Sequence, residues 1–124
     1  IYALVPSENL EPEWKSFSIE NYEASLKNNE RMVVDFYADW CIPCKELDAL
    51  TFSDPEVIEL SKEFETYKAD LTKSLSPEVE SLRDRFKIVG VPTVLILNSR
   101  GEEVERITGF VNAKEFYKTI SVVK

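Results

Sequence analysis

The sequence predicts an α/β fold, namely a three-layer α/β/α sandwich with a central mixed β-sheet. Two near-continuous apolar runs, residues 32–38 and 91–97, are typical of strands that are buried on both faces. Further strands are expected at 66–71 and, as a charged edge strand after a turn, at 103–108. Segments with helical spacing alternate with these strands, which indicates helices packed on both faces of one sheet.

Start signals for helices support this alternation. Ser18 is placed to cap a helix, and Pro55 and Pro77 each follow a capping residue, as is typical of the first position of a helix. We expect the helix after the first buried strand to turn Leu47 and Leu50 inward. The expected helices span residues 18–27, 41–50, 55–64, 77–86 and 113–122.

The 124-residue chain is long enough to bury a core as one domain. Its first residues lack periodicity, so we expect an arm or linker at 1–17 and the folded domain at 18–124. We expect Trp14 and Phe17 of the arm to dock on the domain. The chain begins with Ile1 rather than Met, so we expect it to be processed or cut from something longer. No signal peptide and no apolar run of about 20 residues is visible.

The composition is acidic, with a formal net charge of −8 and a pI near 4.6. Nucleic-acid phosphates and anionic membranes repel such a chain, so the charge argues against both as partners. The charge favours solubility and identifies no partner by itself.

The chain holds only two cysteines, Cys41 and Cys44, in the segment Trp-Cys-Ile-Pro-Cys-Lys at residues 40–45. A disulfide between them closes almost no loop, so it would stabilise the fold little. A zinc half-site would need two more nitrogen or sulfur ligands, but the chain has no His and no third Cys. An accidental buried pair is the other alternative, although the position after a buried strand and at a helix start favours redox chemistry.

Each residue of this segment has an expected role in thiol–disulfide exchange. A working pair needs one exposed, acidified thiol, because the thiolate is the nucleophile. We expect Cys41 to be that thiol, since unpaired N–H groups and the dipole at a helix N-terminus favour negative charge. Cys44, less than one turn further on, is expected to resolve the mixed disulfide. Pro43 lacks an N–H, which costs nothing in the first turn, and it stiffens the loop.

Asp35 is the second candidate catalytic residue. It lies in a strand that should be covered on both faces, where an unpaired carboxylate is costly. The strand-to-helix turn can bring it beneath the cysteine pair, where we expect a raised pKa and a role in accepting the proton of Cys44. The alternative is an Asp at the strand end that water reaches.

Three other charged residues could act on the pair. Asp48 lies four residues after Cys44, on the same helix face, where a carboxylate would oppose thiolate formation and could relay protons. Lys45 could favour the thiolate of Cys41, and Lys68 could direct its charge towards the buried acid from a neighbouring strand. For each of the three, a solvated surface residue is the alternative.

With these residues placed, the chain resembles the thioredoxin superfamily. The matching marks are the buried acid, the Cys-x-x-Cys segment and the Val-Gly-Val-Pro-Thr stretch at 89–93. The resemblance implies that Pro92 is a cis-proline beside the disulfide and that the backbone of Val91 pairs with an extended partner segment. It also implies that Trp40, Ile42 and Pro43 contact the substrate, within a thioredoxin-like domain.

Residues 35–41, 44–48 and 51–57 are similar to the C-terminal periplasmic domain of the DsbD family, bacterial transmembrane thiol:disulfide interchange proteins. This resemblance implies a disulfide reductase that needs no cofactor and lies in the periplasm. It would relay electrons from a membrane-embedded domain to an N-terminal domain of the same protein. Asp48 stands where that family usually has the longer Glu. The arm at 1–17 would suit a tether after a membrane domain.

Two other functions remain open from the sequence. One is a self-standing thioredoxin-like reductase, which could also be cytoplasmic. The other is a non-catalytic binding module with the same fold. In each case we expect a monomer whose partners are proteins, not nucleic acids.

Overall fold

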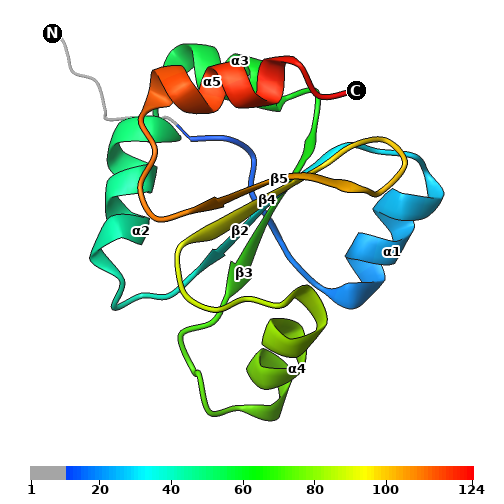
Figure 1. The fold of residues 1–124 in the computed structure, drawn as a ribbon, viewed down its shortest axis with the longest axis vertical. Helices are drawn as coiled ribbons and strands as arrows, with labels where there is room; N and C mark the ends of the chain where they lie inside the picture. Colours follow the sequence, from blue (N-terminus) through cyan, green and yellow to red (C-terminus); the bar gives the residue numbers. More distant parts are fainter. Residues whose placement is uncertain (1–10) are drawn as a thin grey trace, which may run out of the picture.

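The computed structural model describes residues 11–124 and confirms the predicted α/β class (Figure 1). One five-stranded sheet has the strand order β1-β3-β2-β4-β5. β1, β3 and β2 run parallel, whereas β4 is antiparallel to both β2 and β5, so the sheet is mixed as predicted. The strands are β1 (Lys15–Ser16), β2 (Met32–Tyr37), β3 (Glu65–Asp70), β4 (Thr93–Leu97) and β5 (Glu103–Thr108).

Helices cover both faces of this sheet and complete the three layers (Figure 1). One face carries α1 (Ile19–Lys27) and α4 (Pro77–Phe86). The other carries α2 (Ile42–Glu46), its continuation η2 (Leu47–Thr51), α3 (Pro55–Ser61) and α5 (Ala113–Ser121). The predicted start signals are confirmed, because side-chain oxygens of three capping residues accept N–H groups of the first helical turns: Ser18, Asp54 and Ser76.

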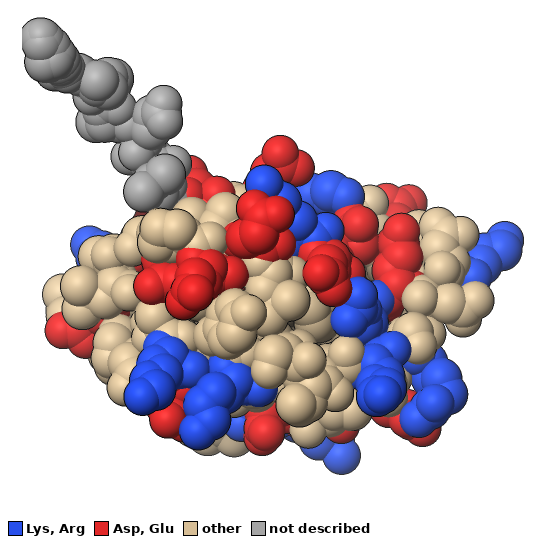
Figure 2. Space-filling model, turned by 90° about the horizontal axis from the view of Figure 1, so that it is seen from above, with Lys and Arg blue, Asp and Glu red and all other residues tan. Residues whose placement is uncertain are grey.

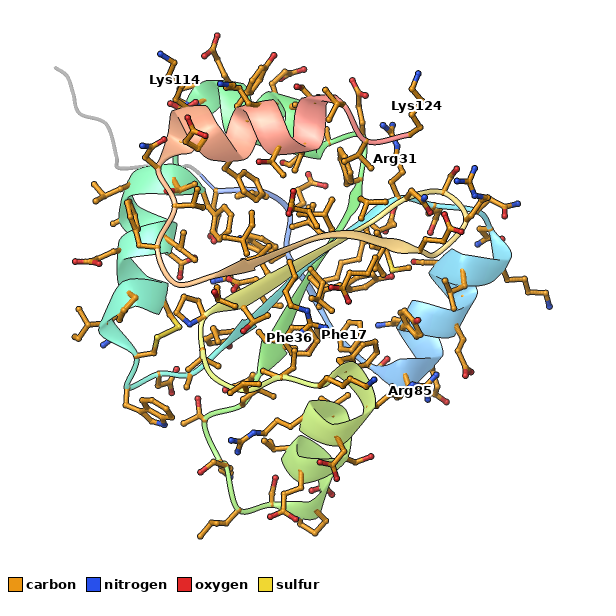
Figure 3. All side chains as sticks on the ribbon, viewed as in Figure 1. Phe17, Arg31, Phe36, Arg85, Lys114 and Lys124 are labelled. Atoms are coloured by element: carbon orange, nitrogen blue, oxygen red, sulfur yellow. A yellow bond between two sulfur atoms is a disulfide. The ribbon has the colours of Figure 1, made fainter. Side chains whose placement is uncertain are left out.

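Each face of the sheet has its own apolar core. On the α1 and α4 side, Phe17 and Phe36 lie next to each other, with ring centroids 5.7 Å apart (Figure 3). On the opposite side, Phe52 meets Phe116 of α5 edge to face at 5.3 Å. The second core fixes the helix that carries the cysteines, since buried Leu47 belongs to it.

The helix after β2 differs from the prediction in its second half. The N–H of Phe52 donates to the carbonyl oxygen of Leu47 at 2.8 Å, five residues back, which is the pattern of a π-helical turn. A π turn holds more residues than an α turn, so Thr51 takes the buried position one turn after Leu47. The expectation that Leu50 faces inward is wrong, because this side chain is 62% exposed.

The end of the arm predicted at 1–17 takes part in the sheet. β1 forms one edge of the sheet and pairs with β3. The N–H of Phe17 donates to the carbonyl oxygen of Lys68 at 2.9 Å. Trp14 packs edge to face on Phe52 at 5.1 Å. The expected docking of these aromatic residues is thus seen, and two residues predicted as arm form a strand. Residues 1–10 of the arm lie outside the described residues, and the division at residue 17 stays a prediction.

The surface carries mixed charge. Figure 2 shows acidic and basic side chains interspersed over the face that α3 and α5 occupy at the top of Figure 1. Within residues 11–124, no helix combines the length and the hydropathy needed to cross a bilayer.

Candidate active site

A disulfide joins Cys41 and Cys44 where the chain leaves β2 and enters α2 (Figure 3). Cys41 is the capping residue of α2, and its sulfur accepts the N–H of Cys44 at 3.1 Å. The Cα atoms are 5.3 Å apart, an ordinary separation for a disulfide. Pro43 lies in the first turn, where its missing N–H leaves no partner unsatisfied. The predicted helix start is therefore the site of the sulfur pair.

Both cysteines are nearly buried in this oxidised state, at 4% exposure for Cys41 and 3% for Cys44. Ala38 is buried with them, and Tyr37 and Val91 pack against the group. The expectation of an exposed Cys41 is therefore wrong for the oxidised residue, because the neighbouring strands and the loop before β4 cover it. The side chains on either side of Cys41 in the sequence are exposed: Trp40 and Ile42.

Asp35 lies in β2 on the sheet face that η2 covers, and its side chain is only 1% exposed. Neither of its carboxylate oxygens accepts a hydrogen bond from the residues that the structure describes. Burial raises the pKa of Asp35 to about 6, although the nearby Lys68 opposes this rise. The alternative of an Asp that water reaches does not hold, and a raised pKa agrees with the prediction.

Lys68 of β3 is the direct neighbour of Asp35 in the parallel β2–β3 register. Its Nζ lies 3.4 Å from Oδ2 of Asp35 and 2.6 Å from Oδ1 of Asp48. Burial lowers the pKa of Lys68, but the two carboxylates outweigh burial and raise it above its ordinary value. The hypothesis that Lys68 directs its charge towards the buried acid is confirmed, and the ammonium links the two acids.

Asp48 is the second residue of the π-helical turn. Its carboxylate forms an ion pair with Lys68, so it is not simply a solvated surface group. Its charge raises the pKa of Asp35, in the same direction as burial does. Lys45, by contrast, is exposed on α2. The structure thus brings Asp35 and Asp48 together through Lys68.

Two aromatic residues of the site had not been predicted for it. The rings of Trp14 and Tyr37 lie 5.2 Å and 4.8 Å from Nζ of Lys68. Strand alternation puts Tyr37 on the same face as Asp35, a signal that could have found it. No comparable signal exists for Trp14, because its position depends on how the arm pairs with β3.

The loop before β4 borders the disulfide. The peptide bond between Val91 and Pro92 is cis, and Val91 packs on the cysteine group. These residues precede β4, so the strand begins two residues later than predicted. A shallow cleft next to this loop is lined mainly by Trp40, Leu71, Arg83, Ile88, Val89 and Val91.

No cluster of three or more His, Cys, Asp or Glu side chains suited to a metal ion occurs between residues 11 and 124. The chemistry that the arrangement can perform is that of the two sulfurs. The ion pair of Asp35 and Lys68, on the strands that lead to the site, can move or hold a proton.

A family model described as a thioredoxin-like domain matches residues 20–124. Among curated proteins, the thiol:disulfide interchange protein DsbD of Haemophilus influenzae is 38% identical over 101 residues. That alignment covers 78% of this chain but 17% of the relative, so the chain spans about a sixth of the length of such relatives.

Solved structures give the same family. The C-terminal domain of Neisseria meningitidis DsbD in its oxidised form has a TM-score of 0.75 and 29% identity, covering 90% of this chain and 99% of that one. Its reduced form has a TM-score of 0.73 and 30% identity, covering 86% and 97%. The fold, including the placement of its helices on both sheet faces, is therefore similar to that of a domain known in both redox states.

Proposed function

The chain belongs to the thioredoxin-like family, and we propose that it is a thiol:disulfide oxidoreductase of the DsbD C-terminal type. The observation that carries this proposal is the Cys41–Cys44 disulfide at the start of α2, which follows the strand that carries buried Asp35. A disulfide between cysteines three positions apart closes a very short loop and therefore adds little stability. Thiol–disulfide exchange explains its presence better.

In the forward reaction, the thiolate of reduced Cys41 attacks one sulfur of a partner disulfide. A mixed disulfide forms, and the partner's other sulfur leaves as a thiolate. The N–H groups of the first turn of α2 favour the thiolate at Cys41, because the N–H of Cys44 already points at this sulfur.

Cys44 then resolves the mixed disulfide. Its thiol loses a proton to the carboxylate of Asp35, and the new thiolate attacks the sulfur of Cys41. The Cys41–Cys44 bond forms, and the second partner sulfur leaves with the electron pair. The partner has gained two electrons that the dithiol has lost. With a pKa of about 6, Asp35 is ionised at neutral pH yet holds a proton more readily than an ordinary Asp.

The partner docks along the loop before β4. Exposed Trp40 and Ile42 flank the sulfurs, and the cleft beside Val91 offers an apolar wall to an extended segment. No backbone hydrogen bond of Val91 is formed within residues 11–124, so its polar groups remain available to such a segment. Pro43 contributes exposed, rigid surface next to Cys44, whereas Pro92 is buried and shapes the docking edge through the backbone of the loop that it fixes.

The DsbD resemblance supports a proposal for the wider task. The domain receives electrons from a membrane-embedded domain and passes them to a periplasmic acceptor domain of the same full-length protein, with the disulfide as its only redox group. A coding sequence with apolar spans directly upstream of Ile1 would support this task. A start codon at that place would favour the self-standing reductase instead, for which a cytoplasmic location is open.

Turnover of a protein disulfide tests the exchange activity. With insulin as substrate and a chemical reductant, the wild type should reduce the disulfides, whereas Cys41→Ser should not. Full activity of Cys41→Ser would refute the assignment of the attacking sulfur. A wild type that is inert at every pH from 5 to 9 would favour the non-catalytic binding module.

A further inference from the structure

The ammonium group of Lys68 is enclosed by four side chains from three separate parts of the chain. Asp35 of β2 and Asp48 of η2 supply the carboxylates at 3.4 Å and 2.6 Å. Tyr37 of β2 and Trp14 from the segment before β1 supply aromatic rings at 4.8 Å and 5.2 Å from the nitrogen. Only 17% of the lysine side chain is exposed, so this enclosure is nearly complete.

Trp14 is held at this place by contacts on both sides of it in the sequence. The hydroxyl of Thr66 donates to the carbonyl oxygen of Glu13 at 2.9 Å, and the N–H of Phe17 donates to the carbonyl oxygen of Lys68 at 2.9 Å. The ring itself meets Phe52 edge to face at 5.1 Å with an interplanar angle of 72°. The segment that leads into β1 thus delivers a fixed aromatic ring to the lysine next to Asp35.

An aromatic face attracts a cation most strongly where water is excluded, and Trp offers the strongest face. The ring therefore favours Lys68 in the position from which it also attracts Asp35. The groups that face this carboxylate are Lys68 from β3, Asp48 from η2, Tyr37 from its own strand and the uncharged Val94 from β4. Among them, the lysine is the one that favours the ionised carboxylate.

We propose that Trp14 is a positioning residue of the active site, which holds Lys68 against Asp35 and so couples the N-terminal segment to the proton acceptor of the exchange reaction. The importance of this coupling for exchange rests on the proposed function. The coupling itself is a property of the oxidised protein and can be measured without any exchange.

The test follows the side-chain carboxyl carbon of Asp35 by NMR against pH in the oxidised protein. Trp14→Leu keeps apolar volume against Phe52 but removes the aromatic face. Lys68 is then better hydrated and attracts the carboxylate less, so the titration midpoint should rise, by about half a pH unit for a contact of this type. Trp14→Phe, which retains a weaker face, should raise the midpoint less.

The matched control is the same substitution in a Lys68→Met background. If Trp14 acts through Lys68, Trp14→Leu should not move the midpoint there. An unchanged midpoint in the Lys68 protein would overturn the proposal, and so would an equal shift in both backgrounds, since that would indicate a general change in packing. If Trp14→Leu does not fold, the comparison uses Trp14→Phe, for which the absence of a shift would equally overturn it.

Failure of this inference is distinguishable from failure of the proposed function. A wild type that reduces insulin while Trp14 variants leave the midpoint unmoved would remove only the role of Trp14. A wild type that does not exchange disulfides while the midpoint moves as expected would leave the coupling intact and remove only its catalytic purpose.

Discussion

Replacing Asp35 with Asn should stabilise the protein at neutral pH and leave its stability unchanged in acid. The pKa of Asp35 is raised from 3.8 to about 6, chiefly by burial. The unfolded chain therefore releases this proton near pH 3.8, whereas the folded protein holds it until about pH 6. Between these values the unfolded state binds fewer protons, so the free energy of unfolding falls as the pH rises. Below the lower value both states are protonated and the carboxyl costs nothing.

The size of the effect follows from the interval between the two pKa values. Each pKa unit corresponds to about 1.36 kcal/mol, so a rise to about 6 makes ionised Asp35 cost about 3 kcal/mol above pH 6. The side chain is 1% exposed, so solvent screening reduces this figure little. The attraction of Lys68 is already contained in the pKa. Asn is neutral at every pH and removes the cost of the buried charge.

Urea unfolding of the oxidised protein from pH 4 to pH 8 measures this gain. Asp35→Asn should be more stable than the wild type by up to about 3 kcal/mol at pH 7 and by only about 0.5 kcal/mol at pH 4, close to the pKa of the unfolded state. The matched control is Asp84→Asn, at an exposed position of α4, which should change the stability by less than about 0.5 kcal/mol. A variant that is less stable than the wild type at pH 7, or that gains equally at both pH values, would refute this account of Asp35.

Three further predictions concern its surroundings and the core. Lys68→Met should raise the pKa of Asp35 above about 6, because the lysine opposes the effect of burial; an unchanged NMR titration would contradict this ion pair. Phe52→Ala should cost about 3–5 kcal/mol in urea unfolding, since the ring is buried between Trp14 and Phe116, and a loss below about 1 kcal/mol would speak against this core. Asp54→Ala should cost about 1 kcal/mol through loss of a cap that accepts two N–H groups, and an unchanged unfolding midpoint would contradict it.

Local patterns predicted the elements that position the sulfurs. The apolar run at 32–38 identified β2, and alternation within it made Asp35 a buried acid, because both signals depend on the chain near each residue. Caps such as Asp54 were predictable for the same reason, since the side chain bonds N–H groups two and three residues away.

Features that depend on distant contacts were not predictable from these patterns. The strand at Lys15–Ser16 is two residues long and exists through pairing with β3. The π-helical turn changes which residues of its helix face the core, so Leu50 was placed wrongly. The burial of Cys41 and the approach of Trp14 to Lys68 both require the final packing of loops and strands.

The central claim is that Cys41 is the sulfur that attacks and Cys44 the one that resolves. Trapping tests it most directly: reduced Cys44→Ser and Cys41→Ser are each mixed with intact, disulfide-bonded insulin, quenched with acid and weighed as intact proteins by mass spectrometry. We predict that Cys44→Ser accumulates a mixed disulfide through Cys41, while Cys41→Ser accumulates almost none. Equal trapping of both variants, or preferential trapping through Cys44, would contradict the claim.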